Sequence, residues 1–73
     1  MMPAAAERHR MIGVAAYYRA ERRGFAPGGA EAYWLEAEAD IDRLLAAMTR
    51  QGITRADYER VGLRHALRLW SAS

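Results

Sequence analysis

Apolar residues recur at steps of three and four along most of the chain, which is the spacing of an amphipathic α-helix. The clearest run has steps of three, four, three and four, the pattern of a coiled-coil seam. Its members are Trp34, Ala37, Ile41, Leu44 and Met48. A shorter run precedes it, at Met11, Val14, Ala15 and Tyr18. No run of β-branched or aromatic residues alternates with polar ones, so the pattern predicts no strands.

Glycines and a proline divide this helical pattern into three pieces. Gly24 follows two arginines and is typical of a left-handed helix cap, and the segment 25–29 contains a proline and two glycines. Gly52 ends the second piece, and Thr54 with Asp57 three residues later predicts a capped start for the third. The sequence therefore predicts an all-α fold, a helical hairpin plus a third helix in one small domain. The expected ranges are residues 1–73 for the domain and about 4–23, 30–50 and 55–70 for the helices.

The predicted third helix has a wide apolar surface made of two stripes. The first stripe consists of Tyr58, Val61, Ala66 and Leu69. The second consists of Leu63, Leu67 and Trp70. Together the two stripes are wider than the seam of a single helix contact. We therefore expect one side of the third helix to pack on the hairpin and the other side on another chain. Leu63, Leu67 and Trp70 are the candidate protein interface, and packing of the same residues in the core is the alternative.

Charge differs in sign between the segments. Residues 1–24 carry five arginines and two acids, residues 25–52 carry two arginines and five acids, and residues 53–73 carry four arginines and two acids. The segment charges of +3, −3 and +2 add up to the net +2 of the chain. Acids lie near the predicted helix starts and arginines near the ends, as the helix dipole favours. A basic first helix beside an acidic second helix also suits an antiparallel hairpin.

No combination of residues indicates catalysis. Cysteine is absent, and the serines, Ser71 and Ser73, lie in the tail. Carboxylates do share helix faces, as in the pair of Glu36 and Asp40, but the Glu-x-x-His sequences of metal sites in helix bundles are missing. We therefore expect a protein that is not an enzyme, with no catalytic residue, cofactor, metal or small-molecule substrate.

No stretch approaches the roughly 20 apolar residues of a membrane span. The beginning of the chain also lacks the charged start and long apolar core of a secretory signal. These features predict a cytoplasmic protein with no membrane partner.

An alternative interpretation concerns nucleic acid. Residues 44–67 resemble a degenerate helix-turn-helix with Gly52 in the turn, which would align three arginines toward phosphate. These arginines are Arg60, Arg64 and Arg68. Met48 stands against this interpretation because a small residue normally occupies that position. Asp57 and Glu59 also oppose it, since they would bring negative charge to DNA.

A family resemblance covers about residues 16–38. The residues that carry it are Ala16-Tyr17-Tyr18, Glu21, Arg23-Gly24, Gly28 and Trp34-Leu35-Glu36-Ala37-Glu38. This pattern resembles the bacterial domain-of-unknown-function family 2934, with its Ala-Tyr helix, Arg-Gly turn and Trp-Leu-x-Ala-Glu helix. Arg19 and Ala20 depart from the family, which commonly has an aliphatic and an aromatic residue there. The resemblance implies a helical hairpin and no established activity.

Taken together, these features predict a small helical interaction module. We expect it to form a homo-oligomer or to bind a protein partner. The alternative is an accessory nucleic-acid-binding protein that uses the three arginines of the third helix.

Overall fold

The computed structural model of the chain describes residues 3–71 and contains three helices and no strand in that range. The helices are α1 (Ala5–Arg22), α2 (Ala30–Gln51) and α3 (Arg55–Trp70). The predicted all-α fold is therefore confirmed. The expected domain range of 1–73 includes residues 1–2 and 72–73, which lie outside the described residues.

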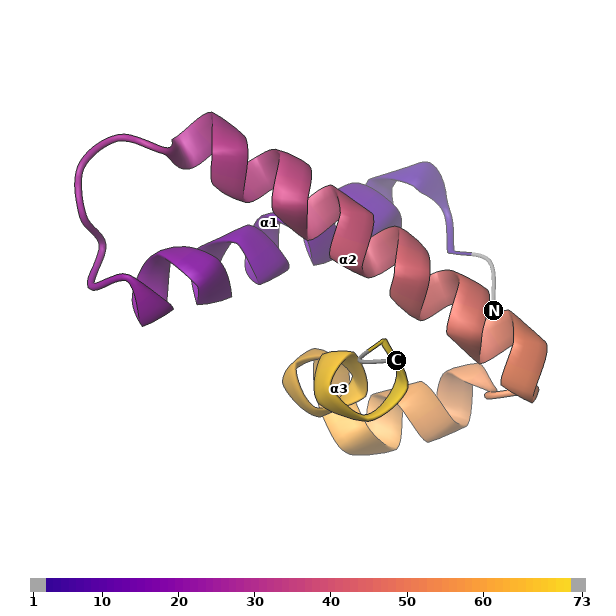
Figure 1. The fold of residues 1–73 in the computed structure, drawn as a ribbon. Helices are drawn as coiled ribbons and strands as arrows, with labels where there is room; N and C mark the ends of the chain where they lie inside the picture. The colour runs from indigo at the N-terminus through magenta and orange to yellow at the C-terminus, as the bar shows by residue number, and fades with distance from the viewer. Residues whose placement is uncertain (1–2, 72–73) are drawn as a thin grey trace.

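The first two helices form an antiparallel hairpin, and α3 packs below α2 near its C-terminal end (Figure 1). Gly24 has a φ of 67°, the left-handed conformation expected of a cap residue. Its N–H donates to the carbonyl of Glu21 at 3.1 Å, and the N–H of Phe25 donates to the carbonyl of Ala20 at 2.8 Å. These two bonds form the Schellman motif that ends α1. Phe25 itself has a φ of 55°, which is unusual for a bulky residue.

The core lies between α2 and the other two helices. Four of the five residues in the seam of α2 are completely buried, whereas Trp34 is half-buried. Met11, Ile12 and Ala15 from α1 and Ala66 from α3 complete the centre of this core. Burying each large apolar side chain contributes roughly 1.5–3 kcal/mol to folding. The packing of α2 therefore follows from its sequence pattern.

Charged residues align α1 with α2 as the segment charges indicate. The guanidinium of Arg8 donates from Nη2 to Oδ1 of Asp42 at 2.9 Å. Near the other end of the hairpin, Arg19 donates to Asp40 through Nε at 3.0 Å and to Glu36 through Nη1 at 2.6 Å. Opposite charges thus face each other at both ends of the hairpin.

The third helix begins as predicted but changes direction at Gly62. The hydroxyl of Thr54 accepts the backbone N–H of Asp57 at 3.1 Å, and the carboxylate of Asp57 accepts the N–H of Thr54 at 3.0 Å. Gly62 has φ 79° and ψ 163°, a conformation open essentially to glycine alone. Figure 1 shows that the axis of α3 turns partway along the helix. The third helix expected over about 55–70 thus has the bounds of α3, but it bends at Gly62, which the sequence reading did not predict.

No helix in residues 3–71 is both long and apolar enough to cross a membrane.

Candidate binding surfaces

A shallow apolar groove lies between α1 and the start of α2. We call it the hairpin groove, and its volume is about 390 Å³. It is lined by His9, Arg10, Gly13, Val14, Tyr17 and Trp34. All but one of these residues lie on α1, and Trp34 comes from the second turn of α2. A groove of this volume falls within the range of sites that bind ligands or partner side chains.

Aromatic side chains give the hairpin groove its shape. The ring of His9 lies 4.7 Å from the ring of Trp34, measured between centroids. Gly13 leaves space beside Trp34, since an added Cβ would lie 3.7 Å from its Cζ3 atom. Tyr17 contacts Phe25 with centroids 5.3 Å apart, although these two side chains are 55% and 54% exposed. The apolar surface therefore continues from the groove to the loop after α1.

Two charged side chains of the hairpin, one at the groove and one at the start of α2, lack an ion pair within the described chain. Arg10, at the groove, has no ion-pair partner among residues 3–71. Glu31 is the one acidic side chain in that range without an ion pair. One turn after Glu31, the side chain of Leu35 is 57% exposed. The two residues share a face of α2 because they are four positions apart.

The predicted interface of the third helix lies partly inside the domain. Leu63, Leu67 and Trp70 are half-buried and pack against the core, beside the fully buried Ala66. Leu69, which the prediction assigned to the other stripe, is 61% exposed. The use of Leu63, Leu67 and Trp70 by another chain stays a prediction.

Sequence reasoning missed the exposed apolar residues of the hairpin. One signal of exposed apolar residues was available. Tyr17 and Tyr18 are neighbours in the sequence, and neighbouring side chains of a helix point in different directions. Trp34 and Leu35 form a second adjacent pair of this kind. In each pair one member packs inward and the other is exposed.

The three arginines of the nucleic-acid interpretation have different environments. Gly62 interrupts the helix between Arg60 and Arg64, so their four-residue spacing no longer places them on one face. Arg60 pairs with Asp57 of its own helix at 3.2 Å. Nucleic-acid binding by these residues stays a prediction.

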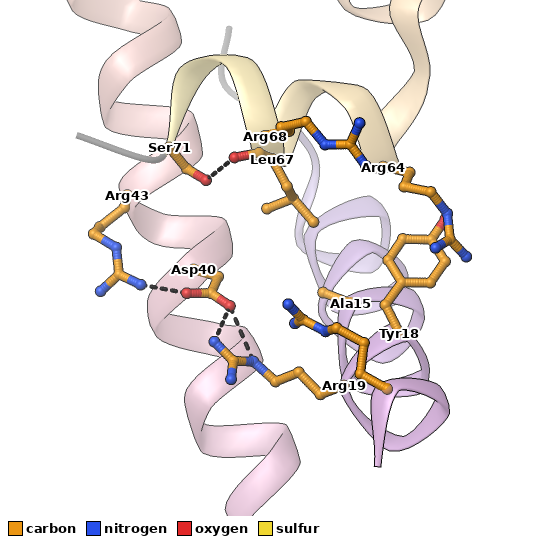
Figure 2. A pocket seen from close by; sticks show the side chains of 10 residues that line it. Ala15, Tyr18, Arg19, Asp40, Arg43, Arg64, Leu67, Arg68 and Ser71 are labelled. Atoms are coloured by element: carbon orange, nitrogen blue, oxygen red, sulfur yellow. Dashed lines mark hydrogen bonds and ion pairs between the residues drawn. The ribbon is translucent and has the colours of Figure 1, made fainter. Parts of the chain in front are cut away.

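Arg64 and Arg68 lie on the part of α3 after the bend, near α1 (Figure 2). Arg64 donates to Glu21 at 3.0 Å, and this hydrogen bond raises the pKa of its guanidinium above the ordinary value. The same guanidinium covers the ring of Tyr18 at 4.1 Å from the centroid. Arg68 has no ion-pair partner among residues 3–71.

Four of the five acidic residues of α2 accept hydrogen bonds from arginines of α1, and Glu31 is the exception. Glu36 and Asp40 accept from Arg19, and Glu38 and Asp42 accept from Arg8. Across the described part of the chain, no three His, Asp or Glu side chains gather as metal ligands would. The shared helix face of these carboxylates is thus explained by the hairpin.

Comparison with known proteins gives one match. Residues 7–43, just over half of the chain, match the model of a family described as a protein of unknown function, DUF2934. The matched segment contains the whole hairpin groove and the resemblance at residues 16–38, and it ends before α3. Comparisons with curated proteins and with solved structures gave no match.

Proposed function

The chain belongs to the DUF2934 family of proteins of unknown function. We propose that it is a non-catalytic helical module that self-associates through the hairpin groove. The observation that carries the proposal is an exposed apolar groove built from the family-matched segment. Contiguous apolar surface on a small domain commonly marks an interaction site. The groove holds one imidazole and one phenol, those of His9 and Tyr17, and its lining includes no carboxylate that would orient either as a base or nucleophile.

A second copy of the chain is the occupant that the chemistry favours. The groove offers an apolar slot with the cationic side chain of Arg10 at its edge. The chain itself presents the complement, because Leu35 is exposed with Glu31 one turn before it. In a two-fold symmetric dimer each contact occurs twice, so Leu35 of each copy would enter the groove of the other. Glu31 would then pair with Arg10 across the interface.

The backbone conformation of Phe25 supports a binding role for the apolar surface that Phe25 forms with Tyr17. A bulky residue in the left-handed region costs roughly 1–2 kcal/mol. Phe25 adopts this conformation and nevertheless leaves half of its side chain in water beside Tyr17. Such strain tends to persist at sites that bind something.

The test is the molar mass of the chain in solution across a concentration series, measured by sedimentation equilibrium. We expect a concentration-dependent dimer that the Leu35→Glu variant abolishes while its circular dichroism stays helical. Leu69→Glu is the matched control, because Leu69 is as exposed as Leu35 but lies on α3. A monomer at every concentration, or equal effects of the two variants, contradicts the proposal.

A charge exchange locates the contact more sharply. Arg10→Glu and Glu31→Arg should each weaken the dimer through repulsion, and the double variant should restore it. Neither residue has an ion pair in the monomer that the exchange would disturb. If the double variant is no better than the single variants, the two residues do not meet across the interface.

A further inference from the structure

A second cavity lies where all three helices meet, away from the hairpin groove. We call it the arginine cleft, and its volume is about 430 Å³. It is lined by Ala15, Tyr18, Arg19, Arg22, Asp40, Arg43, Arg64, Leu67, Arg68 and Ser71. Figure 2 shows side chains from α1, α2 and the last part of α3 around this space. Its volume is sufficient for a small organic molecule.

Five arginines and one carboxylate line the cleft, and three of the arginines are held in place by acids. Asp40 accepts from both Arg19 and Arg43, and its side chain is only 18% exposed (Figure 2). Glu36 holds Arg19 a second time at 2.6 Å. Arg64 is held by Glu21 and by the ring of Tyr18 below it. These arginines are oriented before any ligand arrives.

The remaining two arginines leave positive charge at the cleft. Arg22 and Arg68 both line it, and neither has an ion-pair partner among residues 3–71. Acids pair with three of the five arginines, and the two unpaired arginines contribute a charge of +2. A ligand that neutralises this charge is a dianion. A phosphate monoester fits, because it carries about −1.5 to −2 charges at neutral pH and arginine binds its oxygens through paired N–H groups.

Apolar residues complete the cleft. Ala15 is buried, and Tyr18 and Leu67 are half-buried. Their apolar surface can cover the organic part of an ester, which a bare inorganic ion lacks. A ligand of this site therefore combines a dianionic phosphate with a small apolar group.

We propose that the arginine cleft binds the phosphate monoester of a small organic molecule, with Arg22 and Arg68 as its principal charge partners. The site depends on the bend at Gly62, since Arg64, Leu67 and Arg68 all follow it. It also lies partly outside the family-matched segment of residues 7–43. The proposal is independent of self-association through the hairpin groove.

The probe for this site is phenyl phosphate, titrated into the full chain and followed by amide chemical shifts and calorimetry. We expect one saturable site whose shifts centre on the cleft, and weaker binding of inorganic phosphate, which lacks the apolar group. Arg22→Gln and Arg68→Gln should each reduce the affinity roughly tenfold, which corresponds to about 1.4 kcal/mol. Arg50→Gln is the control, because Arg50 is exposed and unpaired in the described residues but lies outside the cleft.

Acidity provides an independent readout. The affinity for phenyl phosphate should fall as the pH drops below about 6, where a phosphate monoester takes up its second proton. Absence of saturable binding, or an equal loss in the Arg50→Gln variant, overturns the proposal. Binding of duplex DNA without any saturable response to phenyl phosphate also overturns it and favours the nucleic-acid interpretation.

Discussion

Arg19 and Asp40 form the most enclosed ion pair described between α1 and α2, with side chains that are 21% and 18% exposed. Nε of Arg19 donates to Oδ2 of Asp40 at 3.0 Å, while Nη1 reaches Glu36 one turn earlier. One guanidinium therefore spans two carboxylates on α2. The pair also forms one wall of the arginine cleft (Figure 2).

The first prediction follows from this forked geometry. Arg19→Lys should lower the free energy of unfolding by about 1 kcal/mol, because an ammonium cannot direct paired N–H groups at two carboxylates. Urea denaturation measures the change. Arg43→Lys is the control, since Arg43 bonds the same Asp40 but is 58% exposed, and pairs of that kind contribute little. Equal losses in the two variants would show that the fork is unimportant.

The second prediction concerns the bend in α3. Gly62→Ala should destabilise the fold by roughly 1–3 kcal/mol, because alanine is strained at the φ and ψ of Gly62. Beyond its chain neighbours and the backbone of its own helix, nothing lies within 4 Å of the added Cβ, so the effect comes from backbone conformation. Thermal unfolding followed by circular dichroism measures it. An unchanged melting temperature would mean that α3 is equally stable without the bend.

Gly13→Ala is the matched control for this prediction. Gly13 lies inside α1, and its added Cβ would meet Trp34 at an ordinary contact distance of 3.7 Å. Because alanine favours a helix more than glycine does, the substitution should stabilise the fold by roughly 0.5–1 kcal/mol. The two glycines are thus expected to respond with opposite signs. A loss of stability in Gly13→Ala would contradict the packing described at Trp34.

The bend also shows where prediction from sequence reached its limit. Helix positions followed from local signals, since caps such as Gly24 and the pair of Thr54 and Asp57 act over a few residues. A glycine inside a helical pattern does not reveal its φ, because tertiary packing decides whether the helix bends there. The apolar spacing held one clue, a step of five between Val61 and Ala66 where helices have three or four.

The candidate sites were less predictable than the fold. Arg22 and Arg68 both line the arginine cleft, although they lie far apart in the sequence. No local sequence pattern connects residues so far apart. The hairpin groove depends on which of two adjacent aromatic residues turns outward, and that choice is made by packing of α1 against α2. Periodicity identifies apolar faces but does not say which face another helix of the same chain will cover.

The third prediction separates core from interface at Leu63. Leu63 is half-buried against the core, so Leu63→Ala should cost about 1–2 kcal/mol of stability, less than the loss at a fully buried leucine. Leu69→Ala, at an exposed position of the same helix, should change stability by less than about 0.5 kcal/mol. Urea denaturation at low protein concentration gives both values. If Leu63→Ala instead lowers the molar mass and leaves monomer stability unchanged, Leu63 is an interface residue.

The fourth prediction concerns pH and the start of α3. The backbone N–H and the side chain of Thr54, with a further contribution from Arg60, hold the pKa of Asp57 below its ordinary value of 3.8. Because this pKa is lowered on folding, the contribution of Asp57 to stability is complete above the ordinary value. This contribution to stability is lost as the pH falls through the lowered pKa of Asp57.

Asp57→Asn isolates this contribution. The stability difference between wild type and Asp57→Asn should be constant near neutral pH and should shrink as the pH falls below about 4, where the carboxylate becomes protonated. Melting temperatures across an acid pH series measure the difference. A constant difference for Asp57→Asn down to about pH 2 would mean that the ionised carboxylate does not contribute to the cap.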